Sequence, residues 1–237
     1  MTRQFTIQTA IRMIPSNLQQ ALVGLLDFPV EGIRWAEVKR NNVGPVLTVL
    51  RELSSEQSDC VEDLYRQVFD LASDRGIQAL TESCNYSGNS KMISQLPDGN
   101  VYAKAAWARI HYPEVFHTAR RIDEVEQMAW WRKRDDLPVR APRTDCESIS
   151  SLAKQVSDLL LTEQGRGQQC TVEIFNRGAV HYYFGFPDDY LNSVITHDTE
   201  GKLSSSPMRQ TFQIVWAYHE TEGSLEVYAR VPPRILD

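Results

Sequence analysis

The chain has 237 residues, of which 42% are hydrophobic and 24% charged, and its formal net charge is −6. These proportions are close to globular averages, which excludes collagen-like, low-complexity and wholly disordered proteins. The length predicts one large domain or two small ones with a substantial core. The negative net charge argues against a protein that binds nucleic acid or anionic membranes with its whole surface, but it is compatible with a local basic patch.

No part of the sequence resembles a membrane helix or a secretion signal. No stretch approaches the roughly 20 apolar residues that span a bilayer, and polar residues interrupt the N-terminus where a signal peptide needs an apolar run. We therefore expect a cytoplasmic protein. Its cysteines contain no C-x-x-C pair, and we expect them to be buried free thiols: Cys60, Cys84, Cys146 and Cys170.

The first 40 residues carry two patterns typical of strands. Apolar and polar residues alternate over 5–13, which predicts a half-buried strand ended by Pro15. Apolar residues over 18–25 are spaced for one face of a helix. The segment 32–40 is expected to be extended again.

Helical patterns dominate the next hundred residues. The short apolar segment 46–53 favours a helix, and 59–75 predicts an amphipathic helix with Gly76 as its stop. Residues 83–99 are rich in Asn, Ser and Gly and are expected to form a long polar loop. Further helix is expected from about Tyr102 to a point before Leu137.

Beyond this point the pattern changes from helices to strands. Residues 136–144 contain two prolines and little apolar content, which is typical of a linker. A helix is expected over 145–164, followed by hairpins over 170–186 and 211–231 that are rich in aromatic and β-branched residues. We expect these strands to form an antiparallel sheet covered by the helix.

These patterns predict an α+β protein in three parts. The parts are an N-terminal mixed α/β region over 1–135, a proline-containing linker over 136–144, and a C-terminal region of helix and antiparallel sheet over 145–237.

One motif suggests metal-dependent catalysis. Glu37-Val38-Lys39 follows Asp27 and resembles the short signature of PD-(D/E)xK nucleases, in which two carboxylates hold Mg²⁺ and a lysine orients the attacking water. On a strand, Glu37 and Lys39 would point to the same face. The alternative interpretation, which we favour, is a solvated strand end with two charges side by side.

A second motif is a near-repeat of two histidine-containing segments. His197-Asp198-Thr199-Glu200-Gly201 is echoed by His219-Glu220-Thr221-Glu222-Gly223. Imidazoles and carboxylates at neighbouring hairpin ends could hold a divalent ion, with His181 or Asp188 and Asp189 as further ligands. We favour the simpler interpretation that the same hairpin turn is used twice.

Basic and aromatic side chains concentrate over 120–143. From Tyr102 to Arg143 nine basic residues outnumber six acidic ones, a local excess of three positive charges. Arginine beside tryptophan suits phosphate contacts and base stacking. The residues that would bind nucleic acid are Arg120, Arg121, Trp130, Arg132, Lys133 and Arg134.

We expect a non-enzymatic regulatory or adaptor protein that binds another macromolecule, most simply a protein, without a cofactor. The first alternative is a nuclease that uses Asp27, Glu37, Lys39 and Mg²⁺. The second alternative is nucleic-acid binding through 120–143.

Overall fold

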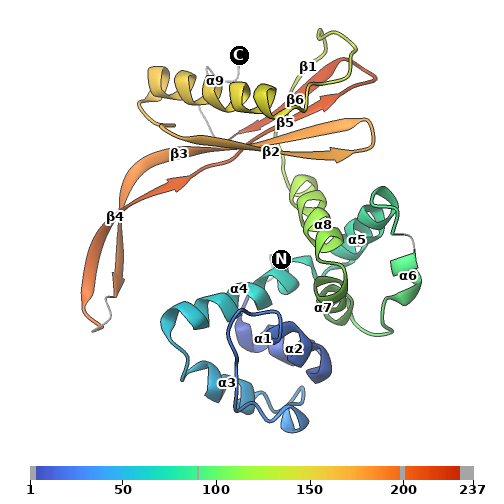
Figure 1. The fold of residues 1–237 in the computed structure, drawn as a ribbon, viewed down its shortest axis with the longest axis vertical. Helices are drawn as coiled ribbons and strands as arrows, with labels where there is room; N and C mark the ends of the chain where they lie inside the picture. The colour runs from blue at the N-terminus through green and yellow to red at the C-terminus, as the bar shows by residue number, and fades with distance from the viewer. Residues whose placement is uncertain (1–3, 90, 198–200, 230–237) are drawn as a thin grey trace. The chain divides into compact units, whose positions relative to one another are not determined.

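The computed structural model describes residues 4–89, 91–197 and 201–229, and within them the chain forms two compact units (Figure 1). The first unit is Met1–Gln127 and the second is Met128–Asp237. Helices and an antiparallel sheet are both present, which confirms the α+β class. The division between the units precedes the segment 136–144.

Among its described residues, the first unit is built almost entirely from helices. The core is formed by their apolar faces, where Tyr65, Phe116 and Leu22 are among the largest fully buried side chains. In chain order the helices are α1 Ile7–Met13, α2 Ser16–Val23, the 3₁₀ turn η1 Trp35–Glu37, α3 Gly44–Leu50, α4 Ser55–Leu71, α5 Asp74–Tyr86, α6 Lys91–Gln95, α7 Val101–His111 and α8 Pro113–Glu126.

The helices expected near 18–25 and 46–53 are confirmed, but both strands expected before residue 41 are wrong. The first is α1, because Ala10, Ile11 and Ile14 share a buried helical face and Thr6 caps the N-terminus. A segment this short fits both the two-residue period of a strand and the 3.6-residue period of a helix, and its packing against the other helices decides which one forms. The second is the single turn η1 followed by an isolated bridge between Lys39 and Asn42.

The prediction that Gly76 ends a helix is also wrong. Helix α4 ends at Leu71, and Gly76 lies in the first turn of α5, where its amide donates to the Ser73 hydroxyl at 2.9 Å. A Cβ at this position would lie 1.9 Å from the Leu71 carbonyl oxygen. Glycine is therefore required by the close approach of two helices, and α5 continues into part of the expected loop over 83–99.

The second unit is a sheet with one long helix. Helix α9 Cys146–Gln164 begins at the Asp145 cap and ends at Gly165, as expected. The strands are β1 Arg132–Arg134, β2 Cys170–Arg177, β3 Val180–His197, β4 Leu203–Thr211, β5 Ile214–His219 and β6 Ser224–Ala229, in the order β1-β6-β5-β3-β2 with β4 on β3. All pairs are antiparallel.

Two strands of this unit were not expected. β1 lies where the sequence predicted the end of a helix, and it pairs with β6. β4 pairs with the second half of β3, so the two form an arm that extends beyond the sheet (Figure 1). Apolar side chains on this arm are exposed, among them Leu191, Ile195 and Leu203.

Residues 136–144 are fastened to the second unit by hydrogen bonds. The Leu137 amide donates to the Gly223 carbonyl at 3.0 Å. Tyr218 Oη lies 2.7 Å from the Pro138 carbonyl oxygen and accepts from the Arg140 amide at 3.2 Å. These bonds hold the segment against the sheet in an extended course that leads into α9.

Two further expectations concern single residues and whole helices. All four cysteines are free, but the expected burial is wrong for Cys60 and Cys146, which are exposed because they lie on outward positions of α4 and at the start of α9.

None of the helices in the described ranges combines the length and the apolar character that spanning a bilayer requires.

Candidate functional site

Helix α9 covers only one side of the sheet face on which it lies. Its core contacts run from Val156 and Leu160 to Ile214, and its neighbours in the sheet are mainly β2 and β3. The sheet continues through β5 to β6 and β1, where Trp216 and Val227 are only partly buried against this cluster. The register places Trp216 opposite Val227 and Tyr218 opposite Leu225, so these side chains belong to the α9 face.

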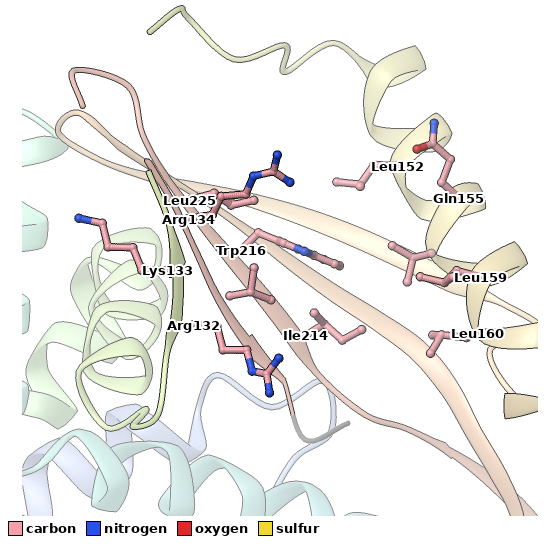
Figure 2. Close-up of a pocket in the computed structure, with 12 residues that line it drawn as sticks. Arg132, Lys133, Arg134, Leu152, Gln155, Leu159, Leu160, Ile214, Trp216 and Leu225 are labelled. Carbon is pink, nitrogen blue, oxygen red and sulfur yellow. The ribbon is translucent and has the colours of Figure 1, made fainter. Parts of the chain in front are cut away.

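The open part of this face is a groove of about 510 Å³ (Figure 2). Its floor is formed by Ile214, Trp216, Leu225 and Val227, and its wall on the helix side is formed by Leu152, Gln155, Val156, Leu159 and Leu160. Leu159 is 46% exposed although its neighbour Leu160 is buried. The groove is therefore a mostly apolar surface between a helix and a sheet that the described residues cover only in part.

Strand β1 forms the basic rim of the groove. Arg132 pairs with Val227 and Arg134 pairs with Leu225, so both arginines lie on the α9 face of the strand. Figure 2 shows their side chains on the same side of β1 as Trp216. The Arg134 guanidinium binds the Asp136 carboxylate through two hydrogen bonds of 2.5 and 3.0 Å, and both side chains are exposed.

Lys133 differs from its two neighbours because alternate residues of a strand face opposite ways. Although it borders the groove, its side chain points away from Trp216 and α9 in Figure 2. Its ammonium lies 3.2 Å from the Asp135 carboxylate and 3.5 Å from the Glu222 carboxylate. Hydrogen bonds and charge from Asp135, with the charge of Glu222, raise the pKa of Lys133.

A second hollow continues the groove towards the start of α9. It shares Leu152 and Gln155 with the groove, and its remaining lining is polar: Arg143, Asp145, Glu147, Ser148 and Ser151. The side chain of Asp145 caps the helix by accepting from the Ser148 amide at 2.8 Å, and this bond lowers the pKa of Asp145.

An ion pair fixes the other end of α9 to the base of the β3–β4 arm. Arg166 is buried, and it lies 2.6 Å from the Asp189 carboxylate and over the Phe212 ring. Burial acts to raise the pKa of Asp189, but the hydrogen bonds from Arg166 and from the Tyr190 amide outweigh burial, so this pKa is lowered.

The residues of the nuclease motif do not share a strand. Glu37 ends the turn η1 and pairs with Arg34 at 3.0 Å, whereas Lys39 belongs to the bridge with Asn42. Asp27 lies in the segment that follows α2. The geometry assumed for the motif, with Glu37 and Lys39 on one face of a strand, is therefore wrong.

His219 of the near-repeat and His181, the further ligand considered for it, contact different carboxylates. His181 Nε2 is 2.9 Å from the Glu220 carboxylate, and His219 Nε2 is 3.7 Å from the Glu226 carboxylate. The segment after His219 is the turn between β5 and β6, which confirms the turn interpretation there, whereas 198–200 lie outside the described residues. Over the described ranges, no three His, Cys, Asp or Glu side chains form a group that could hold a metal.

The basic and aromatic residues of 120–143 are divided between the two units. Arg120 and Arg121 lie on α8 of the first unit, and Arg121 pairs with Glu124 at 3.2 Å. Trp130 and the three basic residues of β1 lie in the second unit. Trp130 is 95% exposed and has a positive φ of 68°, which is rare for a bulky residue, whereas Trp131 packs against Tyr228.

Comparisons of the chain with protein-family models, with curated proteins and with solved structures find no match. Its function is therefore inferred from the geometry described above.

The groove is not predictable from the sequence alone, although part of its signal is present there. The alternation over 211–219 places Ile214, Trp216 and Tyr218 on one face of a strand, and Arg132 and Arg134 are among the residues expected to bind nucleic acid. The missing step was the pairing of β1 with β6, which brings these two sets of residues together.

Proposed function

We propose that this protein is a non-enzymatic regulatory or adaptor protein that binds a segment of another protein in the groove between α9, β5, β6 and β1. The observation that carries the proposal is the concave, mostly apolar groove beside Trp216, in which Trp216, Val227 and Leu159 are only partly covered by the described residues. Aromatic and arginine side chains, which are enriched at protein interfaces, supply its floor and rim.

Leu159 supports the same proposal from the helix side. Helix α9 already has a buried face in Val156 and Leu160, so its packing on the sheet does not need Leu159. Burying the exposed part of this leucine under a partner would add about 1 kcal/mol, roughly half the value for a complete leucine side chain. Leu161 is similarly exposed, at 40%, but does not line the groove.

Site-specific photocrosslinking tests the proposal. A benzoylphenylalanine residue replaces Gln155, Leu159 or Leu161 in the full chain, and the protein is irradiated in the cells that make it. Gln155 and Leu159 line the groove, so we expect both to give the same adduct. Leu161 is the control on the same helix and should not give it.

The adduct also identifies the class of partner. An adduct that resists nuclease and yields peptides of a second protein on mass spectrometry supports a protein partner. Equal crosslinking from Leu159 and Leu161, or no adduct from either groove position, contradicts a partner in the groove. An adduct destroyed by nuclease would favour the second candidate below.

Nucleic-acid binding is the second candidate, and it is favoured by Trp130, which is 95% exposed and stands two residues before Arg132 in the sequence. An exposed indole can stack on a base while arginines contact phosphates. Retention of labelled single-stranded DNA or RNA should then weaken as salt rises, and replacing both arginines with alanine should flatten the salt dependence. An unchanged salt slope in the double variant contradicts this candidate.

A further inference from the structure

The open part of the α9 face has the width of one more helix. Neighbouring strands lie about 4.8 Å apart, so the four intervals from β1 to β2 span about 19 Å. Packed helices lie about 8–10 Å from each other, so a face of this width accommodates two of them side by side. Helix α9 lies mainly over β2 and β3, which leaves the second position over β6 and β1.

The length of the hollow also suits a helix. The α9 residues that border the groove and its continuation run from Glu147 to Leu160, which corresponds to about 20 Å of helix. A partner helix of about three turns would lie along this distance. It would bury its apolar side chains between Leu159 on α9 and Trp216 on the sheet.

An extended peptide is disfavoured at the same place. A strand lying on the floor would bury backbone amides and carbonyls against apolar side chains, whereas a helix satisfies its own backbone groups. Addition of a strand to the edge of β1 is disfavoured as well, because β1 is only three residues long and all three carry charge.

The rim determines the charge of the partner. Arg132 and Arg134 lie on the groove side of β1. In the continuation of the groove Arg143 is accompanied by Asp145 and Glu147, so the excess of positive charge is at β1. The bond between Arg134 and Asp136 is an exposed ion pair, which contributes at most about 1 kcal/mol and can be exchanged for another carboxylate. Carboxylates on the flank of the incoming helix would therefore complement the rim.

We infer that the groove binds an amphipathic α-helix of a partner protein, with its apolar face on Trp216 and Leu159 and with Asp or Glu residues beside Arg132 and Arg134. This inference rests on the proposed function and specifies its ligand.

Peptide display tests the inference without a known partner. A library of random 16-residue peptides is selected on the full chain and counter-selected on a Leu159→Asp variant. We expect enriched peptides with apolar residues at i, i+3, i+4 and i+7 and with flanking Asp or Glu. Their circular dichroism should become helical on binding.

Variants of β1 provide a matched test of the rim. The double variant Arg132→Gln, Arg134→Gln should weaken the enriched peptides about tenfold, the sum of two exposed charge pairs. Lys133→Gln removes a charge from the same strand on the other face and should change affinity less than twofold. Equal effects of the double variant and Lys133→Gln would overturn the role of the rim.

The outcomes separate this inference from the proposed function. Enriched peptides that depend on Leu159 but alternate with period two, or carry basic flanks, overturn the helix and leave the groove as a protein-binding site. Failure to enrich any peptide that depends on Leu159 contradicts both. Dimerisation that is abolished by Leu159→Asp in sedimentation would identify a second copy of the chain as the occupant and would overturn the inference.

Discussion

Gln19 is expected to be the most costly polar side chain to replace in the first unit. It is 1% exposed, and its amide nitrogen lies 2.8 Å from both the Ile11 and Ile14 carbonyl oxygens. In a continuous helix the Ile11 carbonyl would accept from the amide of residue 15, but Pro15 has no N–H to donate. The side chain of Gln19 therefore supplies the donor that the proline lacks.

The magnitude follows from the number of groups left without a partner. Gln19→Leu removes both donated bonds and also the acceptor of the Tyr65 hydroxyl, which lies 3.2 Å from Gln19 Oε1. Each buried polar group without a partner costs about 1–3 kcal/mol, so three of them give at least about 3 kcal/mol. Gln20→Leu, on the exposed side of the same helix, is the control and should stay within about 0.5 kcal/mol.

Hydrogen exchange of the full chain measures this loss in each unit separately. Gln19→Leu should lower the protection of α4 amides by at least about 150-fold, which corresponds to about 3 kcal/mol, and leave β5 unchanged. Tyr65→Phe leaves only Gln19 Oε1 without a hydrogen-bond partner, so it should cost about 1 kcal/mol of unfolding free energy. The reasoning is refuted if Gln19→Leu costs no more than Gln20→Leu.

Two further predictions concern a turn and a histidine. Gly223 has φ +64°, and an added Cβ would lie 2.3 Å from the Leu137 carbonyl oxygen, so Gly223→Ala should cost more than about 2 kcal/mol of unfolding free energy. Gly165 has φ +68° with open space around it, so Gly165→Ala should cost only about 1 kcal/mol. Equal losses for the two variants in urea denaturation would contradict the steric argument. Although His117 is exposed, partial loss of hydration and the charges of Arg109 and Arg120 lower its pKa. The folded state therefore binds this proton at lower pH than the unfolded state, and stability should fall as the pH drops below about 6.5. His117→Gln should weaken this dependence between pH 8 and pH 5.5, and an unchanged dependence would contradict the prediction.

The sequence predicted most accurately those elements whose caps and apolar faces agree. Helix α9 has an Asp145 cap, one apolar face and Gly165 in the left-handed conformation at its end, and its limits were predicted to within a residue or two. The hairpin of β5 and β6 was predicted from its alternation and its glycine turn. In both cases the information lies within about 20 consecutive residues.

The failures occurred where distant residues determine the structure. The alternation over 5–13 is compatible with a helix once Ile11 and Ile14 are buried against the other helices. Gly76 is a residue type that commonly ends helices, but here it allows the close contact with Leu71. Strand β1 has no apolar residue, so no local pattern indicates it. Its pairing with Leu225 and Val227, about 90 residues later, is what creates the strand.

The same long-range pairing changes how the basic residues are interpreted. On a helix, Arg132, Lys133 and Arg134 would spread around the axis, and nothing would separate them chemically. On β1, the two arginines face the apolar floor and Lys133 faces the other way, towards Glu222. A partner in the groove should therefore distinguish the arginines from the lysine, whereas a nucleic acid that binds the positive charge of the strand as a whole should be weakened by the loss of any of the three. Comparing Arg134→Gln with Lys133→Gln in both binding assays decides between a groove that recognises a protein and a basic strand that recognises phosphates.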